Sequence, residues 1–92
     1  MRLAIEVKRL TKAYISKGGK KNRRQQRNRM IAFAKFVDAM GIHYMGQVGR
    51  RHVIEYWKAN RSLAPRTLYN HWLAIRDLWE LADKSEEGPL PK

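Results

Sequence analysis

The stretch APRTLYNHWLAIRDLWELAD, residues 64–83, decides the fold of this chain. Its apolar residues recur at steps of four, three, four and three, which places them along one side of an α-helix: Leu68, Trp72, Ile75, Trp79 and Ala82. Pro65 suits the first helical position, because an N–H there would have no partner within the helix. The pattern predicts an amphipathic helix that buries a Trp-rich side.

Two further helices are predicted on the N-terminal side of this stretch. Residues 2–16 place Leu3, Val7, Leu10 and Tyr14 on one helical stripe. The paired glycines of the segment 17–20 predict a flexible connector. The next helix is expected over roughly residues 23–40, where Asn22 and Gln25 resemble a capping box and the apolar residues keep helical spacing: Met30, Ile31, Phe33, Ala34, Val37 and Met40.

Gly41 is expected to end that helix, and the loop from 41 to 49 carries apolar residues that can be buried: Ile42, Met45 and Val48. Residues 50–60 again predict a helix, with Val53, Tyr56 and Trp57 on one side. The chain shows no alternating strand pattern and no internal repeat. The sequence therefore predicts an all-α fold, a compact bundle of four helices.

Positive charge dominates the chain and is unevenly placed. The 92 residues hold 20 Lys and Arg against eight Asp and Glu, a formal net charge of +12. Residues 1–76 carry 18 of the basic residues and three acidic ones, whereas residues 77–92 carry two basic and five acidic. A polyanionic partner is expected, and nucleic acid is favoured over a membrane because every predicted helix has a role in the core.

Two groups of polar residues are candidates for contact with that polyanion. The basic run 17–29 contains no acidic residue, so its mutual repulsion needs an external anion. Its candidate contact residues are Lys20, Lys21, Arg23, Arg24, Arg27 and Asn28. Helical spacing places Arg23, Arg27 and Met30 on one stripe, and Arg24, Gln25 and Asn28 on a second, amide-bearing stripe that can read base edges. Around the opening of the last helix, where backbone N–H groups favour a phosphate, the candidates are Arg66, Thr67, Asn70 and His71.

Other chemistry is not favoured. The aromatic residues lie on or near apolar stripes, so core packing is expected rather than base stacking, and Tyr44 is the one least committed to the core. The three histidines lack the spacing that brings two to one zinc ion, and the chain has no cysteine. Asp77, Glu80 and Asp83 look like a solvated helix side rather than an acid–base pair. We expect no metal and no cofactor.

Several of these segments together resemble a known family. They are RQQRNRMIAFAKFVDAMG, the loop Met45–Val48 leading to VIEYW, and SLAPRTLYNHWLAIRDLWELA before a Gly/Pro tail. The chain is similar, over roughly residues 3–91, to the N-terminal core-binding, SAM-like domain of tyrosine recombinases and phage integrases. The resemblance implies a four-helix bundle whose second and fourth helices lie in the major groove of double-stranded DNA. It assigns DNA contact to Arg23, Arg24, Arg27 and Asn28, and to the four residues at the opening of the last helix.

The resemblance also implies partners that this chain does not contain. Strand cleavage in the family needs a nucleophilic Tyr and a His-x-x-Arg spacing, and no histidine of this chain is followed by Arg three residues later. We therefore expect no catalytic residues here, a core-binding domain over residues 1–86, and residues 87–92 as the start of a linker. Cleavage would come from a catalytic domain of the same polypeptide, and other recombinase protomers would share the DNA.

Two alternatives remain open from the sequence. The chain could be a stand-alone basic helical protein that binds RNA or organises a nucleoid, or a SAM-like module that binds an acidic protein partner. The N-terminus lacks the apolar run of a signal peptide or membrane span, so a cytoplasmic location is expected. The resemblance would make the protein bacterial or phage-encoded and nucleoid-associated.

Overall fold

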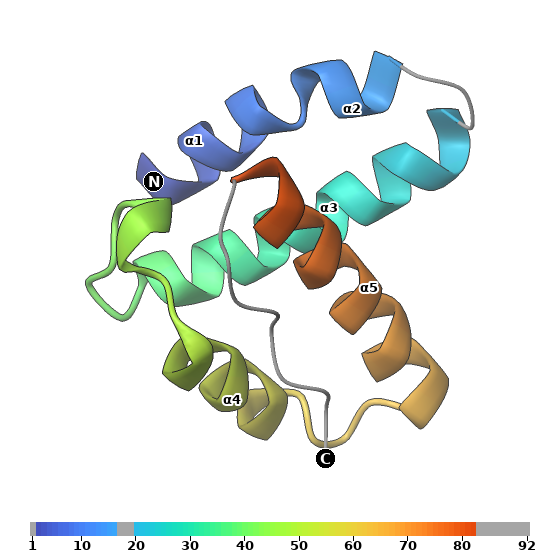
Figure 1. The fold of residues 1–92 in the computed structure, drawn as a ribbon. Coiled ribbons are helices and arrows are strands. Elements are labelled where there is room, and N and C mark those ends of the chain that lie inside the picture. Colours follow the sequence, from blue (N-terminus) through green and yellow to red (C-terminus); the bar gives the residue numbers. More distant parts are fainter. Residues whose placement is uncertain (1, 17–19, 83–92) are drawn as a thin grey trace.

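The longest helix, α3 (Lys20–Asp38), lies at the centre of the fold, and every other α-helix contacts it (Figure 1). The computed structural model describes residues 2–16 and 20–82, without the side chains of 20 and 21. Before α3 come α1 (Arg2–Leu10) and α2 (Lys12–Ser16), and after it come the 3-10 turn η1 (Met45–Gln47), α4 (Arg50–Ala59) and α5 (Pro65–Leu81). These described ranges contain no strand, so the predicted all-α class is confirmed.

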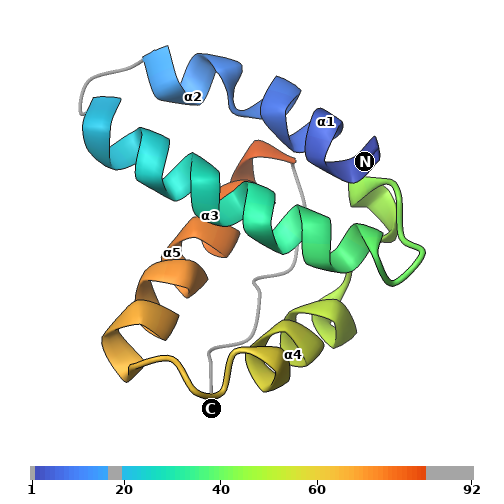
Figure 2. The same cartoon turned by 180° about the vertical axis from the view of Figure 1, so that it is seen from behind.

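The first predicted helix is observed as two, α1 and α2, divided at Thr11. The fully buried Thr11 hydroxyl donates to the carbonyls of Val7 at 2.9 Å and of Lys8 at 3.2 Å. Bonding of this kind to the preceding turn competes with the regular helix and often bends it. The two segments still follow one another along one side of α3 (Figures 1 and 2).

The predicted apolar stripes meet in one core. Leu3 and Val7 of α1 are fully buried, and Trp79 of α5 is nearly so. Phe33 of α3 joins the helices, since its ring centroid lies 5.2 Å from that of Tyr56 in α4 and 6.1 Å from that of Trp79. Trp72 and Tyr14 are only partly buried at the edge of the core. Most aromatic residues are therefore core residues, as expected.

The helix ends test the predicted boundaries. The helix α3 ends at Asp38, two residues before the predicted end, and Gly41, at φ 89°, lies in the turn that closes it: its N–H donates to the carbonyl of Asp38, and the N–H of Ile42 reaches the carbonyl of Val37. Pro65 is the first residue of α5, as expected. The capping box at Asn22 is wrong, because α3 already begins at Lys20 and Asn22 lies inside it.

Two carboxylates fix α1 antiparallel to α3 and against the following loop. Asp38 Oδ2 accepts the N–H of Leu3 at 2.9 Å, and this bond is the main reason why the pKa of Asp38 lies below its ordinary value. Glu6 Oε1 accepts the N–H of the buried Met45 at 3.0 Å. Both acids therefore serve the fold.

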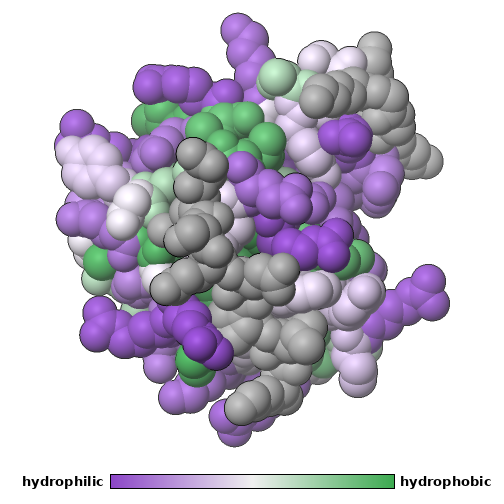
Figure 3. All heavy atoms as spheres, viewed as in Figure 1, coloured by the Kyte–Doolittle hydropathy of each residue, from purple (hydrophilic) through white to green (hydrophobic). Residues whose placement is uncertain are grey.

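The predicted connector at 17–19 and the tail from Asp83, including the proposed linker 87–92, lie outside the described residues. The described surface is mostly hydrophilic on the side shown in Figure 3, with hydrophobic residues gathered beside α1. In the described part of the chain, no helix has the length and apolar character needed to cross a membrane.

Candidate nucleic-acid interface

One side of α3 points away from the core and carries basic and amide groups. Arg24, Gln25, Asn28 and Lys35 are all exposed, with the small Ala32 between them. Positions 24, 28, 32 and 35 are separated by steps of four, four and three residues, which keeps them on one side of a helix. We call these five residues the outer face of α3. Figure 2 shows α3 running across the front of the molecule while α5 passes behind it.

The outer face agrees with the predicted helical stripe, whereas contact of its residues with DNA stays a prediction. Arg24, Gln25 and Asn28 were expected to form an amide-bearing stripe on a different side from Met30, and Met30 is indeed fully buried. Lys35 was not among the predicted contact residues. Its helical spacing from Arg24 and Asn28 places it on the same side of the helix. The side chains of Lys20 and Lys21 lie outside the described part of the chain.

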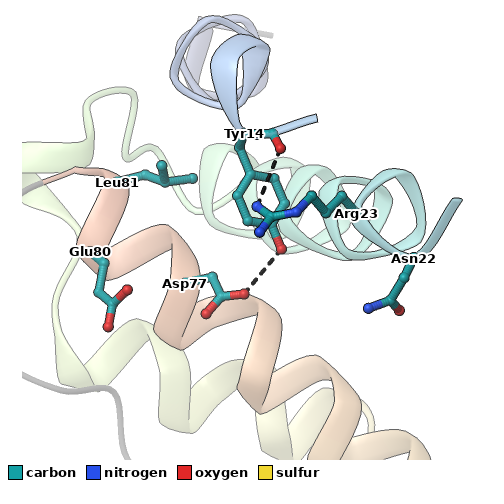
Figure 4. A pocket seen from close by; sticks show the side chains of 6 residues that line it. All are labelled: Tyr14, Asn22, Arg23, Asp77, Glu80 and Leu81. Atoms are coloured by element: carbon teal, nitrogen blue, oxygen red, sulfur yellow. Dashed lines mark hydrogen bonds between the residues drawn. The ribbon is translucent and has the colours of Figure 1, made fainter. Parts of the chain in front are cut away.

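Arg23 does not lie on the outer face. Its Nη1 donates to the carbonyl of Tyr14 at 3.3 Å, and its guanidinium carbon lies 4.5 Å from the centroid of the Tyr14 ring. The Tyr14 hydroxyl in turn donates to Asp77 Oδ2 at 3.1 Å (Figure 4). Burial, followed by the nearby Asp77 carboxylate, raises the pKa of Tyr14. Arg23 thus joins α2, α3 and α5.

We call this place the α2–α3–α5 junction, a cleft of about 450 Å³ lined by Tyr14, Asn22, Arg23, Asp77, Glu80 and Leu81 (Figure 4). Asp77 also lies 3.9 Å from Nη2 of Arg76. Contrary to the expected solvated helix side, Asp77 is half-buried and bonded within the fold, whereas Glu80 is exposed as expected. The structure therefore uses Arg23 and Asp77 to hold helices together.

Arg27 is half-buried on the same side of α3 as Arg23 and Met30. Its Nε is buried, and no hydrogen-bond partner for it lies among the residues that the structure describes. The sequence placed Arg23, Arg27 and Met30 on one stripe, and the structure shows that this stripe faces the other helices. The assignment of Arg23 and Arg27 to DNA stays a prediction.

The residues at the opening of α5 differ in exposure: some face solvent and form an outer part, and His71 faces α4 and forms an inner part. Arg66 is exposed, and Thr67 and Asn70 are partly exposed. The N-cap residue Ala64 makes no side-chain hydrogen bond, so the first-turn N–H groups gain no cap from it. The helix therefore presents Arg66 and Asn70 where an anion or a base edge could approach.

His71 belongs to the inner part. Its Nδ1 lies 3.1 Å from the Tyr56 hydroxyl of α4, and the two ring centroids are 5.8 Å apart. Burial raises the pKa of Tyr56 to about 12, so this hydroxyl keeps its proton, and the histidine tautomer decides which of the two groups donates. Burial and the charge of Arg29 lower the pKa of His71. This histidine helps to hold α4 against α5.

Within the described ranges, few exposed cations pair with an acidic side chain. Among the described residues, the side-chain ion pairs within 4.0 Å are His43–Asp38, Lys58–Glu55 and Arg76–Asp77. None of these pairs involves Arg24, Lys35 or Arg66. The same described residues contain no group of three His, Cys, Asp or Glu side chains placed to hold a metal ion.

Comparison with known protein families, with functionally characterised proteins and with solved structures finds no match to this chain.

Proposed function

We propose that this domain binds double-stranded DNA through the outer face of α3, with the opening of α5 as a second contact. The observation that carries the proposal is the outer face itself: Arg24 and Lys35 are exposed cations without acidic neighbours in ion-pair range among the described residues, and Asn28 lies between them. Cations there would displace counterions from phosphates, which supplies affinity.

The shape of α3 suits a groove. Its 19 residues span about 28 Å at 1.5 Å per residue, and an α-helix fits the major groove of B-DNA. Arg24 and Asn28 are one turn apart on the exposed side. Arg pairs well with guanine and Asn with adenine, whereas Lys35 suits a phosphate. The outer face therefore carries residues suited to phosphate contact and residues suited to base recognition.

The finer proposal is a role in site-specific recombination. The domain would hold one side of a recombination site, and a catalytic domain of the same polypeptide would cut and rejoin the strands. The resemblance of α3 and α5 to recombinase core-binding sequences supports this assignment, and so does the concentration of positive charge in residues 1–76. Recombinase protomers on the same DNA would be further partners.

Fluorescence anisotropy with a labelled blunt duplex across a salt series tests the proposal. We expect affinity to fall steeply with salt, because several phosphates are neutralised. A slope of log affinity against log salt near zero would contradict duplex binding. Tighter binding to an RNA duplex of the same sequence would favour the RNA-binding alternative instead.

Base reading has its own test in a library of duplex sequences. Changing Asn28, Arg66 or Asn70 to Ala should alter the preferred sequence, by about 1–3 kcal/mol at a position read by two hydrogen bonds. Lys35→Ala should weaken all duplexes alike. Equal losses on every duplex for all four variants would make these residues phosphate contacts only.

A further inference from the structure

A second cleft lies between α1 and the loop that follows α3. Its volume is about 440 Å³, and it is lined by Arg2, Ile5, Glu6, Arg9, His43 and Tyr44. Two large hydrophobic residues in this lining are markedly exposed, Ile5 at 55% and Tyr44 at 47%. We call it the Tyr44 cleft. An exposed aromatic and aliphatic pair in a concave place marks a binding surface rather than core.

The Tyr44 ring is held in place by its surroundings. The guanidinium carbon of Arg2 lies 4.8 Å from the ring centroid. The next residue, Met45, is buried and donates its N–H to Glu6. An aromatic ring held in this way on a loop is of the kind on which bases stack.

The charge of the cleft suits a phosphate. Arg2 and Arg9 bring two cations, and the one acid in the lining, Glu6, has one carboxylate oxygen occupied by the Met45 N–H. Across the cleft, His43 Nδ1 lies 3.4 Å from Asp38 Oδ1, which orients the imidazole. A ligand with a flat apolar part and a negative group therefore matches the apolar pair Ile5 and Tyr44 and the two arginines.

The cleft adjoins the end of the proposed DNA-binding helix. Asp38, the last residue of α3, bonds the backbone of Leu3 and orients His43. Lys35, the last cation of the outer face, lies one turn before Asp38. A strand leaving a duplex at this end of α3 would pass close to the cleft.

We propose that the Tyr44 cleft binds an unpaired nucleotide that continues from the duplex, with its base against Tyr44 and Ile5 and its phosphate at Arg9. This inference rests on the proposed duplex binding by α3. Bases within a duplex are stacked on one another, so an exposed ring gains nothing from them, whereas an unpaired base offers its π-face. An acidic peptide is the competing occupant.

The test compares two fluorescent probes, a blunt duplex and the same duplex with a three-nucleotide single-stranded extension. For the wild-type chain we expect the extended probe to bind roughly five-fold tighter or more, the minimum expected from one stacked base. Tyr44→Ala and Arg9→Ala should reduce this ratio towards one. Tyr44→Phe keeps the ring and should keep the ratio. Tyr69→Ala removes a similarly exposed tyrosine, at 50%, and should also leave the ratio unchanged.

The outcomes separate this inference from the duplex proposal. Blunt-duplex binding without any gain from the extension overturns the cleft and leaves α3 intact. A gain from the extension without blunt-duplex binding overturns the α3 proposal alone. A gain that survives Tyr44→Ala, or capture of poly-glutamate that Tyr44→Ala abolishes while the extension gives no gain, also overturns the nucleotide site. Circular dichroism of each variant confirms that the helices are kept.

Discussion

Arg23 and Arg24 are neighbours in the sequence, yet they belong to two different regions of the molecule. Arg23 lies at the α2–α3–α5 junction, where its guanidinium bonds the Tyr14 carbonyl and stacks on the Tyr14 ring. Arg24 lies on the outer face of α3, exposed and outside the ion pairs seen among the described residues. One arginine joins helices within the fold, and the other is exposed on the surface.

This comparison shows that the number of positive charges in a segment does not define an interface. In the sequence, the basic residues of the run from 17 to 29 look equivalent, since no acidic residue separates them. Their like charges repel one another. In the structure, internal acceptors such as the Tyr14 carbonyl offset part of that repulsion on one side of α3. Among the described residues of this run, the exposed Arg24 is the cation that the proposed contact with phosphates uses.

The largest effect is expected on the inner side of α3. Phe33→Ala removes a fully buried ring that contacts Tyr56 and Trp79, and should lower the free energy of unfolding by about 3–5 kcal/mol. The neighbouring Ala32→Ser, on the outer face, should change it by less than about 0.5 kcal/mol. Urea denaturation followed by circular dichroism measures both. Similar losses in the two variants would contradict the two-sided description of α3.

On the outer face, the double variant Arg24→Ala, Lys35→Ala should leave stability unchanged but lower duplex affinity roughly ten-fold at low salt. If each side chain meets one phosphate, the slope of log affinity against log salt should fall by about 1.8. Anisotropy titrations at several salt concentrations give both values. An unchanged slope would exclude these two cations from the contact.

Arg23→Ala is the matched control at the junction. It removes the hydrogen bond and the stacking on Tyr14, and should reduce the free energy of unfolding by about 1 kcal/mol. Its salt slope should stay closer to the wild-type value than that of Arg24→Ala. If Arg23→Ala instead flattens the slope and leaves the denaturation midpoint unchanged, Arg23 belongs to the interface.

The hydroxyl of Tyr14 gives a smaller and cleaner change. Tyr14→Phe deletes only the 3.1 Å bond to Asp77 and keeps the ring under Arg23, so a loss of about 1 kcal/mol is expected. Comparison with Tyr69→Phe, an exposed tyrosine on α5, supplies the baseline. Equal stability of the two variants in urea would show that the Tyr14–Asp77 bond adds nothing.

The smallest effect concerns pH and His71. Burial and Arg29 lower the pKa of His71 in the folded chain, so the unfolded chain binds this proton first on acidification. The contribution of His71 to stability is therefore complete above about pH 6.5 and decreases as the pH falls through the lowered pKa. His71→Asn keeps a hydrogen-bonding group near Tyr56 and does not titrate. Its urea midpoint should change less between pH 7.5 and 5.5 than that of the wild-type chain, and an equal change would assign the pH dependence to other groups.

The helices could be predicted from sequence because their signals are local. The stripe from Leu68 to Ala82 and the stop at Gly41 depend only on neighbouring residues, and both agree with the structure. The break at Thr11 could not be predicted in the same way, because it depends on a hydroxyl that the rest of the fold buries.

The candidate site was predictable only in part for the same reason. Helical spacing distinguishes the side of Arg24 from that of Met30, but it does not reveal that Tyr14 would receive Arg23. Nor does it show that Tyr56, on another helix, would hold His71. These contacts join residues distant in the chain, so they require the tertiary structure.

The central claim is that the outer face of α3 contacts duplex DNA, and the most direct measurement is an NMR titration of the isotope-labelled chain with a blunt duplex. We expect the largest chemical-shift changes on Arg24, Gln25, Asn28 and Lys35, with further changes at Arg66 and little change at the Tyr14–Asp77 contact. Changes concentrated at the α2–α3–α5 junction or on α4, with the outer face of α3 unaffected, would contradict it.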